Sequence, residues 1–306
     1  MIRWVQAYIP LTPQGHFVSG EFMRIFKLKK GSKTRTIFCP SKRESFLLKG
    51  MKRKLDWLYL KLGIPESVHG FVYGKNCVTN AKEHVNFNYT ISMDLENFFD
   101  SIRHYHLEMV PYHILKQCLV RGAPRQGLST SPTLSNLALR EFDLWVEQLC
   151  FYNTLWGDKT AYTRYADDIT ISGDDLASLH TIKRQIIYKL NLMGFKLNQK
   201  KTRVQSYKGG RRVITGLAVD NTVNANRKTR RRLRAAVHQN NQDQINGLKG
   251  WTSCTSPMVV NWQAQGTIDN PYIAVHYNNY RKCSKTFKGS RAVFFNHLKR
   301  SIRSGL

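Results

Sequence analysis

The pattern of apolar and polar residues predicts a chain that contains both strands and helices. Two short runs, at residues 22–28 and 34–38, flank a basic turn that contains a glycine, as the strands of a β-hairpin do. Residues 43–62 repeat apolar positions at helical spacing, and Gly63 and Pro65 end this predicted helix. The first third of the chain is therefore expected to form a hairpin followed by a long, basic, amphipathic helix.

Two more helical patterns follow. Ser131 and Pro132 are suited to the N-cap and first position of one helix, whose apolar residues continue to Leu149. Asp174 or Asp175 is suited to cap a second helix, which Gly194 ends.

An aspartate pair interrupts two short strand-like runs within residues 162–172. Ile169 and Ile171 alternate with hydroxyl residues, as a strand requires, so Asp167 and Asp168 are expected at the tight turn of a hairpin. Aspartate is common at polar hairpin tips, and that interpretation needs no function. Two like charges about 4 Å apart cost roughly 4 kcal/mol at an effective dielectric of about 20, however, and a divalent cation removes that cost.

A third carboxylate decides between these interpretations. Residues 90–94 form a strand-like run that ends at Asp94 and leads into a predicted turn and helix. One aspartate at the end of a strand, together with an aspartate pair in a later hairpin, is the arrangement of a two-metal nucleotidyl transferase. In such a site the ions activate a 3′-hydroxyl and stabilise the leaving pyrophosphate.

These residues also resemble a known family. Asp94 with the phenylalanines that follow it, and the box at residues 165–168, resemble motifs A and C of a reverse transcriptase palm. Residues 124–132 resemble motif B, although Arg125 and Ser129 stand where that family usually has proline.

Two shorter boxes narrow the resemblance to retron-type bacterial reverse transcriptases. Asn80 and His84 match an NAxxH box, and residues 213–217 match a VTG box with one inserted isoleucine. A short helix with a capping asparagine and a histidine satisfied in the core explains an NAxxH string more often than a ligand does. The order of the motifs over about residues 22–220 carries the resemblance.

The charge of the chain indicates a polyanionic partner. Lysine and arginine total 48 against 20 aspartate and glutamate residues, a net charge of +28 over 306 residues. This excess favours nucleic acid over membrane, and no stretch approaches the ~20 apolar residues of a membrane-spanning helix. The six cysteines are scattered without metal-binding spacing, and no secretory signal is evident, so we expect a cytoplasmic protein.

The resemblance implies a right-hand polymerase of α+β class with an antiparallel palm sheet. Its expected divisions are fingers at 1–92, palm at 93–225 and a basic thumb at 226–306. It implies two Mg²⁺ ions, held by Asp94, Asp167 and Asp168 with the backbone carbonyl of Leu95. Lys201 is the expected general acid for the leaving pyrophosphate, with Lys200 as the alternative.

The expected contacts with nucleotide and RNA form two sets. The nucleotide set, in which the aromatic residue five positions after Asp94 selects deoxynucleotides, comprises Lys29, Arg35, Phe99, Gln126 and Gly127. The RNA-binding set combines the two boxes with a basic run and comprises Asn80, His84, Thr215, Gly216, Arg227, Lys228, Arg230, Arg231, Arg232 and Arg234.

The resemblance further implies copying of part of a cognate structured noncoding RNA into single-stranded DNA, giving the branched RNA–DNA hybrid called msDNA. The expected partners are that RNA, its cDNA product, deoxynucleoside triphosphates and an effector protein from the same locus, acting in antiphage defence. One alternative is a group II intron or diversity-generating type enzyme, against which the short chain and the paired boxes argue. Another is a non-catalytic RNA-binding scaffold that restrains a partner, against which the three intact aspartates argue.

Overall fold

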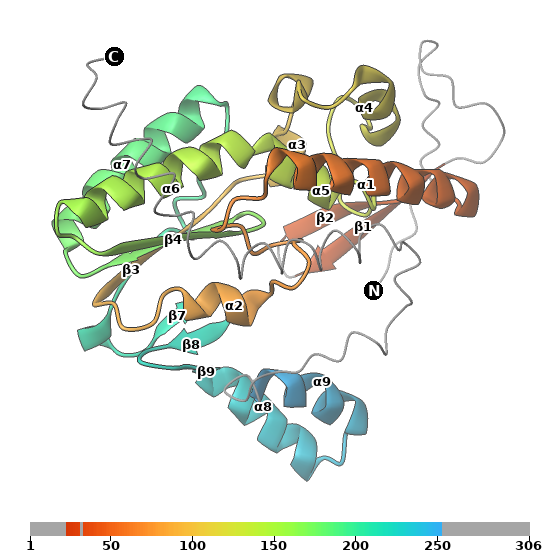
Figure 1. Ribbon diagram of the computed structural model, residues 1–306. Helices are drawn as coiled ribbons and strands as arrows, with labels where there is room; N and C mark the ends of the chain where they lie inside the picture. The colour runs from red at the N-terminus through yellow and green to blue at the C-terminus, as the bar shows by residue number, and fades with distance from the viewer. Residues whose placement is uncertain (1–22, 31–32, 253–306) are drawn as a thin grey trace, which may run out of the picture. The chain divides into compact units, whose positions relative to one another are not determined.

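The computed structural model describes residues 23–30 and 33–252 (Figure 1). All of these residues belong to one compact unit. The part of the expected thumb that follows residue 252 lies outside the described residues.

The predicted N-terminal hairpin and helix are both present. Strands β1 (Arg24–Lys30) and β2 (Lys33–Cys39) pair antiparallel. Helix α1 (Lys42–Leu62) starts at a capping box, in which Ser41 and Glu44 each accept a hydrogen bond from the other's backbone N–H. It ends at Gly63, as predicted.

The central sheet is antiparallel, with strand order β4-β5-β3-β6. Its strands are β3 (Tyr89–Asp94), β4 (Thr160–Tyr165), β5 (Asp168–Gly173) and β6 (Arg203–Ser206). The helices α5 (Ser131–Ala138), α6 (Arg140–Leu155) and α7 (Leu176–Leu192) form the main hydrophobic core with it. The single helix predicted from Ser131 onward is two helices, because Leu139 ends α5 and precedes α6.

The other face of the central sheet is also covered. Figure 1 shows α6 and α7 on one side of the sheet, and α2 with a small sheet on the other. That second layer comprises α2 (Cys77–Lys82), β7 (Arg212–Ile214), β8 (Leu217–Val219) and β9 (Val223–Ala225). The alternation predicted in β5 is therefore present, but its hydroxyl residues Thr170 and Ser172 are as buried as its isoleucines.

The remaining described elements are four short helical segments and a pair of longer helices. They are α3 (Phe98–Ser101), η1 (His104–Leu107), α4 (Tyr112–Cys118), η2 (Tyr207–Gly209), α8 (Arg227–His238) and α9 (Gln242–Thr252). The expected division after residue 92 falls inside β3, which pairs with β5 along its whole length. Within the described ranges, no helix combines the length and apolar character needed to span a bilayer.

Candidate active site

The three predicted aspartates meet at one end of the central sheet. Asp94, the last residue of β3, lies directly opposite Asp168, the first residue of β5. The backbone N–H of Leu95 donates to the carbonyl oxygen of Asp167 at 3.0 Å, which fixes the hairpin against the end of β3. The structure thus brings together the two segments that the sequence separates by more than seventy residues.

The hairpin that carries the aspartate pair turns in two residues, Ala166 and Asp167, between the paired Tyr165 and Asp168. Ala166 has φ of 57°, a conformation that strains a residue other than glycine. Gly70 packs against this turn so closely that a Cβ atom on it would lie 2.3 Å from the Ala166 nitrogen. This position therefore requires glycine, because a side chain would clash with the turn.

A buried arginine also stabilises this turn. The fully buried Arg164 donates to Asp143 of α6 through Nε and Nη2, at 2.8 and 2.6 Å. Its Nη1 donates to the Ala166 carbonyl at 3.0 Å and to Asn136 of α5 at 3.2 Å. Burial alone would lower the pKa of Arg164, but the charge and hydrogen bonds of Asp143 raise it, so the guanidinium stays charged.

The electrostatics of the site favour a bound cation. Desolvation and the charge of Asp94 raise the pKa of Asp167, against the opposing charges of Lys201 and Arg35. Although Asp168 as a residue is exposed, protein atoms surround its carboxyl group. That desolvation, with the charges of Asp167 and Asp94, raises the pKa of Asp168 to about 7. The carboxylates therefore repel one another when all three are ionised.

Lys201 supplies a positive charge to this group. Its Nζ lies 2.5 Å from Oδ1 of Asp94, while the lysine side chain is 45% exposed. Lys201 lines the same cleft as Asp94 and Asp167, and Lys200 does not. The placement favours Lys201 over the alternative as the residue able to reach a leaving pyrophosphate.

Asp94 and Asp167 line a cleft of about 900 Å³, and Asp168 lies next to them without lining it. Four of the five residues predicted to contact nucleotide line or border it. Arg35, Phe99 and Gln126 contribute to its wall, and Gly127 follows directly on Gln126. Lys29 is exposed on β1 and is not among the lining residues.

Gly127 permits a close approach, but to the protein itself. It has φ of +107°, and a Cβ atom on it would lie 2.1 Å from the Phe38 carbonyl oxygen. The Phe38 N–H also donates to the Gln126 carbonyl at 2.8 Å. The motif B loop is thus tied to β2, which carries Arg35.

The structure does not place Asn80 and His84 on an RNA-binding surface. Both side chains are buried, and His84 is fully so. Nδ1 of His84 lies 2.8 Å from the Ser172 hydroxyl, and Nε2 lies 2.7 Å from the Thr163 hydroxyl. The expectation of direct RNA contact at these two positions is corrected: the box packs α2 and the turn that follows it onto β4 and β5. The helix cap is Asn76, not Asn80.

The other predicted RNA-binding residues are accessible to differing degrees. Thr215 and Gly216 form the two-residue turn between β7 and β8, both with positive φ, and Gly216 is exposed. The predicted basic run falls on α8, where all six cations are exposed: Arg227, Lys228, Arg230, Arg231, Arg232 and Arg234.

The oxygen-rich set at the end of the sheet fits divalent cations. Within residues 23–30 and 33–252, no group of three or more aspartate, glutamate, histidine or cysteine side chains is arranged so that it could hold a metal ion by itself. An Mg²⁺ ion that is bound together with substrate phosphates needs only one or two carboxylates from the protein. Two features indicate the fit: the mutual repulsion of the carboxylates and the ammonium group that Asp94 already holds.

Comparison with known proteins agrees with this geometry. The sequence pattern of the family described as reverse transcriptase (RNA-dependent DNA polymerase) matches residues 27–229. The chain belongs to the reverse transcriptase family. That range includes every residue of the predicted aspartate site and its cleft.

The similar curated proteins are retron enzymes, which confirms the retron-type resemblance. The retron Mx65 reverse transcriptase of Myxococcus xanthus is 31% identical over 245 residues, which are 69% of this chain and 54% of that protein. The retron Ec86 reverse transcriptase of Escherichia coli is 28% identical over 243 residues, 74% of this chain and 72% of that protein. The chain thus spans about half the length of the Myxococcus relative.

Solved telomerase structures share the fold. Apo telomerase from Candida tropicalis superposes with a TM-score of 0.53 at 14% identity, covering 72% of this chain and 50% of that one. Candida albicans telomerase in complex with a telomeric RNA fragment gives 0.50 at 13% identity, covering 67% and 46%. Together with the antiparallel sheets, this likeness confirms the predicted α+β polymerase fold.

Arg164, Asp143 and Gly70 are functional candidates that sequence reasoning missed. The available signal was an arginine within a strand that has no other charged residue, directly before the tyrosine of the aspartate box. Charged residues are almost never fully buried unless paired, so an arginine at that position points to an unseen acidic partner.

Proposed function

We propose that this chain is an RNA-directed DNA polymerase of retron type, which copies part of a cognate structured RNA into single-stranded DNA. The observation that carries the proposal is that Asp94 and Asp167 line the same cleft as Arg35 and Phe99, with Asp168 paired opposite Asp94. Family membership supports the same reaction.

The proposed metal is Mg²⁺, held by the three aspartates with the carbonyl of Leu95. When bound, Mg²⁺ lowers the pKa of the attacking 3′-hydroxyl and neutralises charge on the pyrophosphate. Asp94 and Asp168 are held in register by β3 and β5, and the hairpin turn sets Asp167 beside them. Lys201, released from Asp94, donates a proton to the leaving group.

The remaining residues of the cleft select and hold the nucleotide. Arg35 provides positive charge for the triphosphate. Phe99 stacks against Phe98 and Phe71, with ring centroids 5.6 and 6.5 Å apart, and this packing supports it as the residue that excludes a 2′-hydroxyl. Gln126 borders the position of the base or template.

The proposed RNA partner is bound in part by α8. Its exposed arginines and lysine contribute the phosphate contacts that dominate affinity for nucleic acid. The fingers, palm and thumb division remains part of the proposal, with the palm beginning at β3. The resemblance to retron enzymes supports an effector protein from the same locus and a role in antiphage defence.

The test is to purify the protein from cells that carry its native locus and to digest the bound nucleic acid with DNase and RNase. The matched control is the double variant Asp167→Ala/Asp168→Ala. DNA joined to RNA in the wild type and absent in the variant is the expected result. RNA alone in both would contradict synthesis and leave the scaffold alternative.

A further inference from the structure

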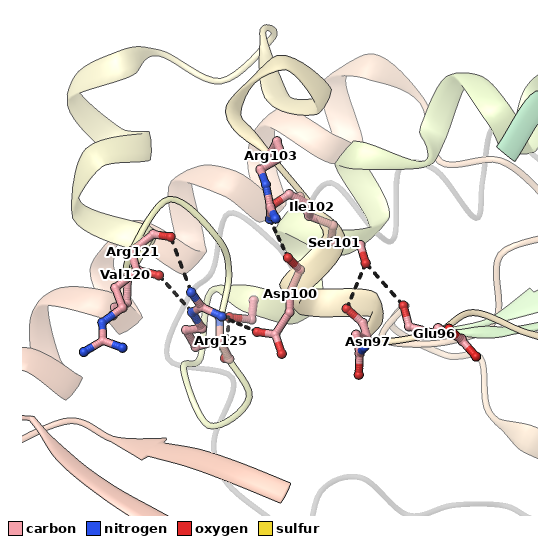
Figure 2. Close-up of polar contacts among 10 residues, drawn as sticks. Glu96, Asn97, Asp100, Ser101, Ile102, Arg103, Val120, Arg121 and Arg125 are labelled. Atoms are coloured by element: carbon pink, nitrogen blue, oxygen red, sulfur yellow. Dashed lines mark hydrogen bonds and ion pairs between the residues drawn. The ribbon is translucent and has the colours of Figure 1, made fainter. Parts of the chain in front are cut away.

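Arg125 occupies the motif B position where proline is usual, and its side chain is held on all sides. It is only 17% exposed and forms an ion pair with Asp100 (Figure 2). Its Nε donates to the Val120 carbonyl at 2.8 Å and its Nη2 to the Arg121 carbonyl at 3.3 Å. The guanidinium also lies 5.7 Å from the centre of the Phe38 ring.

The backbone of Arg125 is anchored as well. Its N–H donates to the Ser131 hydroxyl at 3.0 Å, and that hydroxyl donates to the Arg125 carbonyl at 2.7 Å. Proline could not make the first of these bonds, because it lacks an N–H. The start of α5 therefore fixes the Arg125 backbone, while the Val120 and Arg121 carbonyls and the Phe38 ring of β2 hold its guanidinium.

Asp100, the partner of Arg125, belongs to the helix that carries Phe99, the residue predicted to select deoxynucleotides. Asp100 directly follows Phe99 in α3, which has only four residues. Such a short helix has little stability of its own, so its orientation depends on contacts with its surroundings. Arg103 and Ser101 bond to carbonyls within the same segment (Figure 2) and cannot fix it relative to the cleft wall. Phe98 and the following Ile102 anchor this segment in the main core, and the Asp100–Arg125 pair links α3 to the motif B loop, which also lines the cleft.

The pair also affects the charge of the cleft. Both residues line it, and the Asp100 side chain is 59% exposed. An unpaired carboxylate there would repel a triphosphate. Arg121 lines the cleft too, but its side chain points away from Asp100 in Figure 2 and does not replace Arg125.

We propose that Arg125 is a positioning residue that, through Asp100, fixes α3 and thereby the discrimination by Phe99 between deoxy- and ribonucleotides. This role rests on the proposed polymerase function. It requires no contact between Arg125 and the nucleotide.

The test is single-nucleotide incorporation on an RNA template, with kcat/KM measured for a deoxynucleoside triphosphate and its ribonucleotide counterpart. Asp100→Asn and Arg125→Lys perturb the pair with little change in volume, and Arg125→Pro restores the usual residue. Each is expected to lower the deoxy-to-ribo ratio by about tenfold, which is about 1.4 kcal/mol. The charge-swapped variant Asp100→Arg/Arg125→Asp should recover part of the ratio, and Arg184→Ala on α7 should leave it unchanged.

The outcomes separate the two proposals. An unchanged ratio in folded Asp100→Asn and Arg125→Lys overturns the positioning role. An equal loss with both nucleotides also overturns it, because that result indicates general damage to the cleft. If the wild-type protein incorporates neither nucleotide, the proposed function itself is overturned, and the positioning role with it. The same conclusion follows if the Asp168→Asn variant incorporates nucleotide as well as the wild type does.

Discussion

Asp94 and Asp168 face each other across the last paired position of β3 and β5, and both belong to a site where charge is crowded. The geometry is set by the ladder of the sheet, not by the two side chains. The protein therefore holds two carboxylates together at a cost to its own stability, as expected of a site that binds a cation.

This cost in folding stability can be measured in the presence of a chelator, which keeps cations out of the site. Asp168 titrates near 3.8 when unfolded and at about 7 in the fold, so between these values the folded state holds the extra proton. Wild-type stability accordingly falls as pH rises through that window. Asp168→Asn should raise the free energy of unfolding at pH 8 by about 1 kcal/mol, after allowance for solvent screening.

The gain should become much smaller near pH 4, where Asp168 is protonated in the folded wild type and also partly protonated in the unfolded state. Thermal unfolding of both proteins in EDTA at the two pH values is the measurement. An equal gain at both pH values would show that charge is not its cause.

Gly70→Ala tests the support of the hairpin turn. The added Cβ would meet the backbone nitrogen of Ala166, which cannot move without displacing Asp167 and Asp168. A displacement of about 1 Å lowers turnover by about a hundredfold, so kcat of primer extension should fall to that extent.

Gly50→Ala is the matched control, because nothing lies within 4 Å of a Cβ atom at that position of α1. It should keep full activity and gain up to about 1 kcal/mol of stability. Equal activity of the two variants would show that glycine at position 70 is not needed to place the aspartates.

The buried Arg164–Asp143 pair should dominate the stability of the hairpin. Arg164→Met leaves Asp143 charged and buried without its partner, and is expected to cost about 3–5 kcal/mol in urea unfolding. The double change Arg164→Met/Asp143→Leu should cost less than Arg164→Met alone. Lys52→Ala removes the more exposed pair with Asp56 and should cost no more than about 1 kcal/mol. A small loss from Arg164→Met would show that the pair is not needed to hold the turn.

His84 should couple the second layer to the sheet in a pH-dependent way. Burial and the charge of Arg212 lower the pKa of His84 to about 3. An unfolded histidine titrates near 6.5, so the unfolded state takes up the proton first and the fold loses stability as pH falls from 6.5 towards 3. One such proton contributes a slope of about 1.4 kcal/mol per pH unit.

His84→Gln keeps groups that can bond to Ser172 and Thr163 but does not titrate. Its unfolding free energy should fall less steeply than that of the wild type between pH 6 and 4. His69, whose pKa burial lowers to about 4, is present in both proteins and cancels in the comparison. Identical pH slopes of the unfolding free energy would mean that His84 takes up its proton in the folded state over the same pH range as in the unfolded state.

Lys201 and Lys200 can be separated by kinetics. Lys201 touches Asp94 in the cleft, so Lys201→Gln should lower kcat by about a hundredfold with little change in the KM for nucleotide. Lys200→Gln is the matched change outside the cleft and should have little effect. The reverse pattern would reassign the general acid.

The sequence predicted the aspartate site because each carboxylate lies at a strand end that local patterns reveal. It also predicted α1 and its end at Gly63, which depend on neighbouring residues alone. The burial of His84 was not predictable in this way, because it depends on a small sheet that covers the second face of β5. Arg164 and Asp143 are separated by 21 residues and lie on different elements, so no local pattern pairs them.

The central claim is tested most directly by primer extension on a defined RNA template with deoxynucleoside triphosphates and Mg²⁺. The account predicts extension by the wild type, its abolition by EDTA, and at least a hundredfold loss in Asp168→Asn even though that variant is folded and more stable at pH 8. Extension that persists in Asp168→Asn, or no extension by folded wild-type protein, would contradict it.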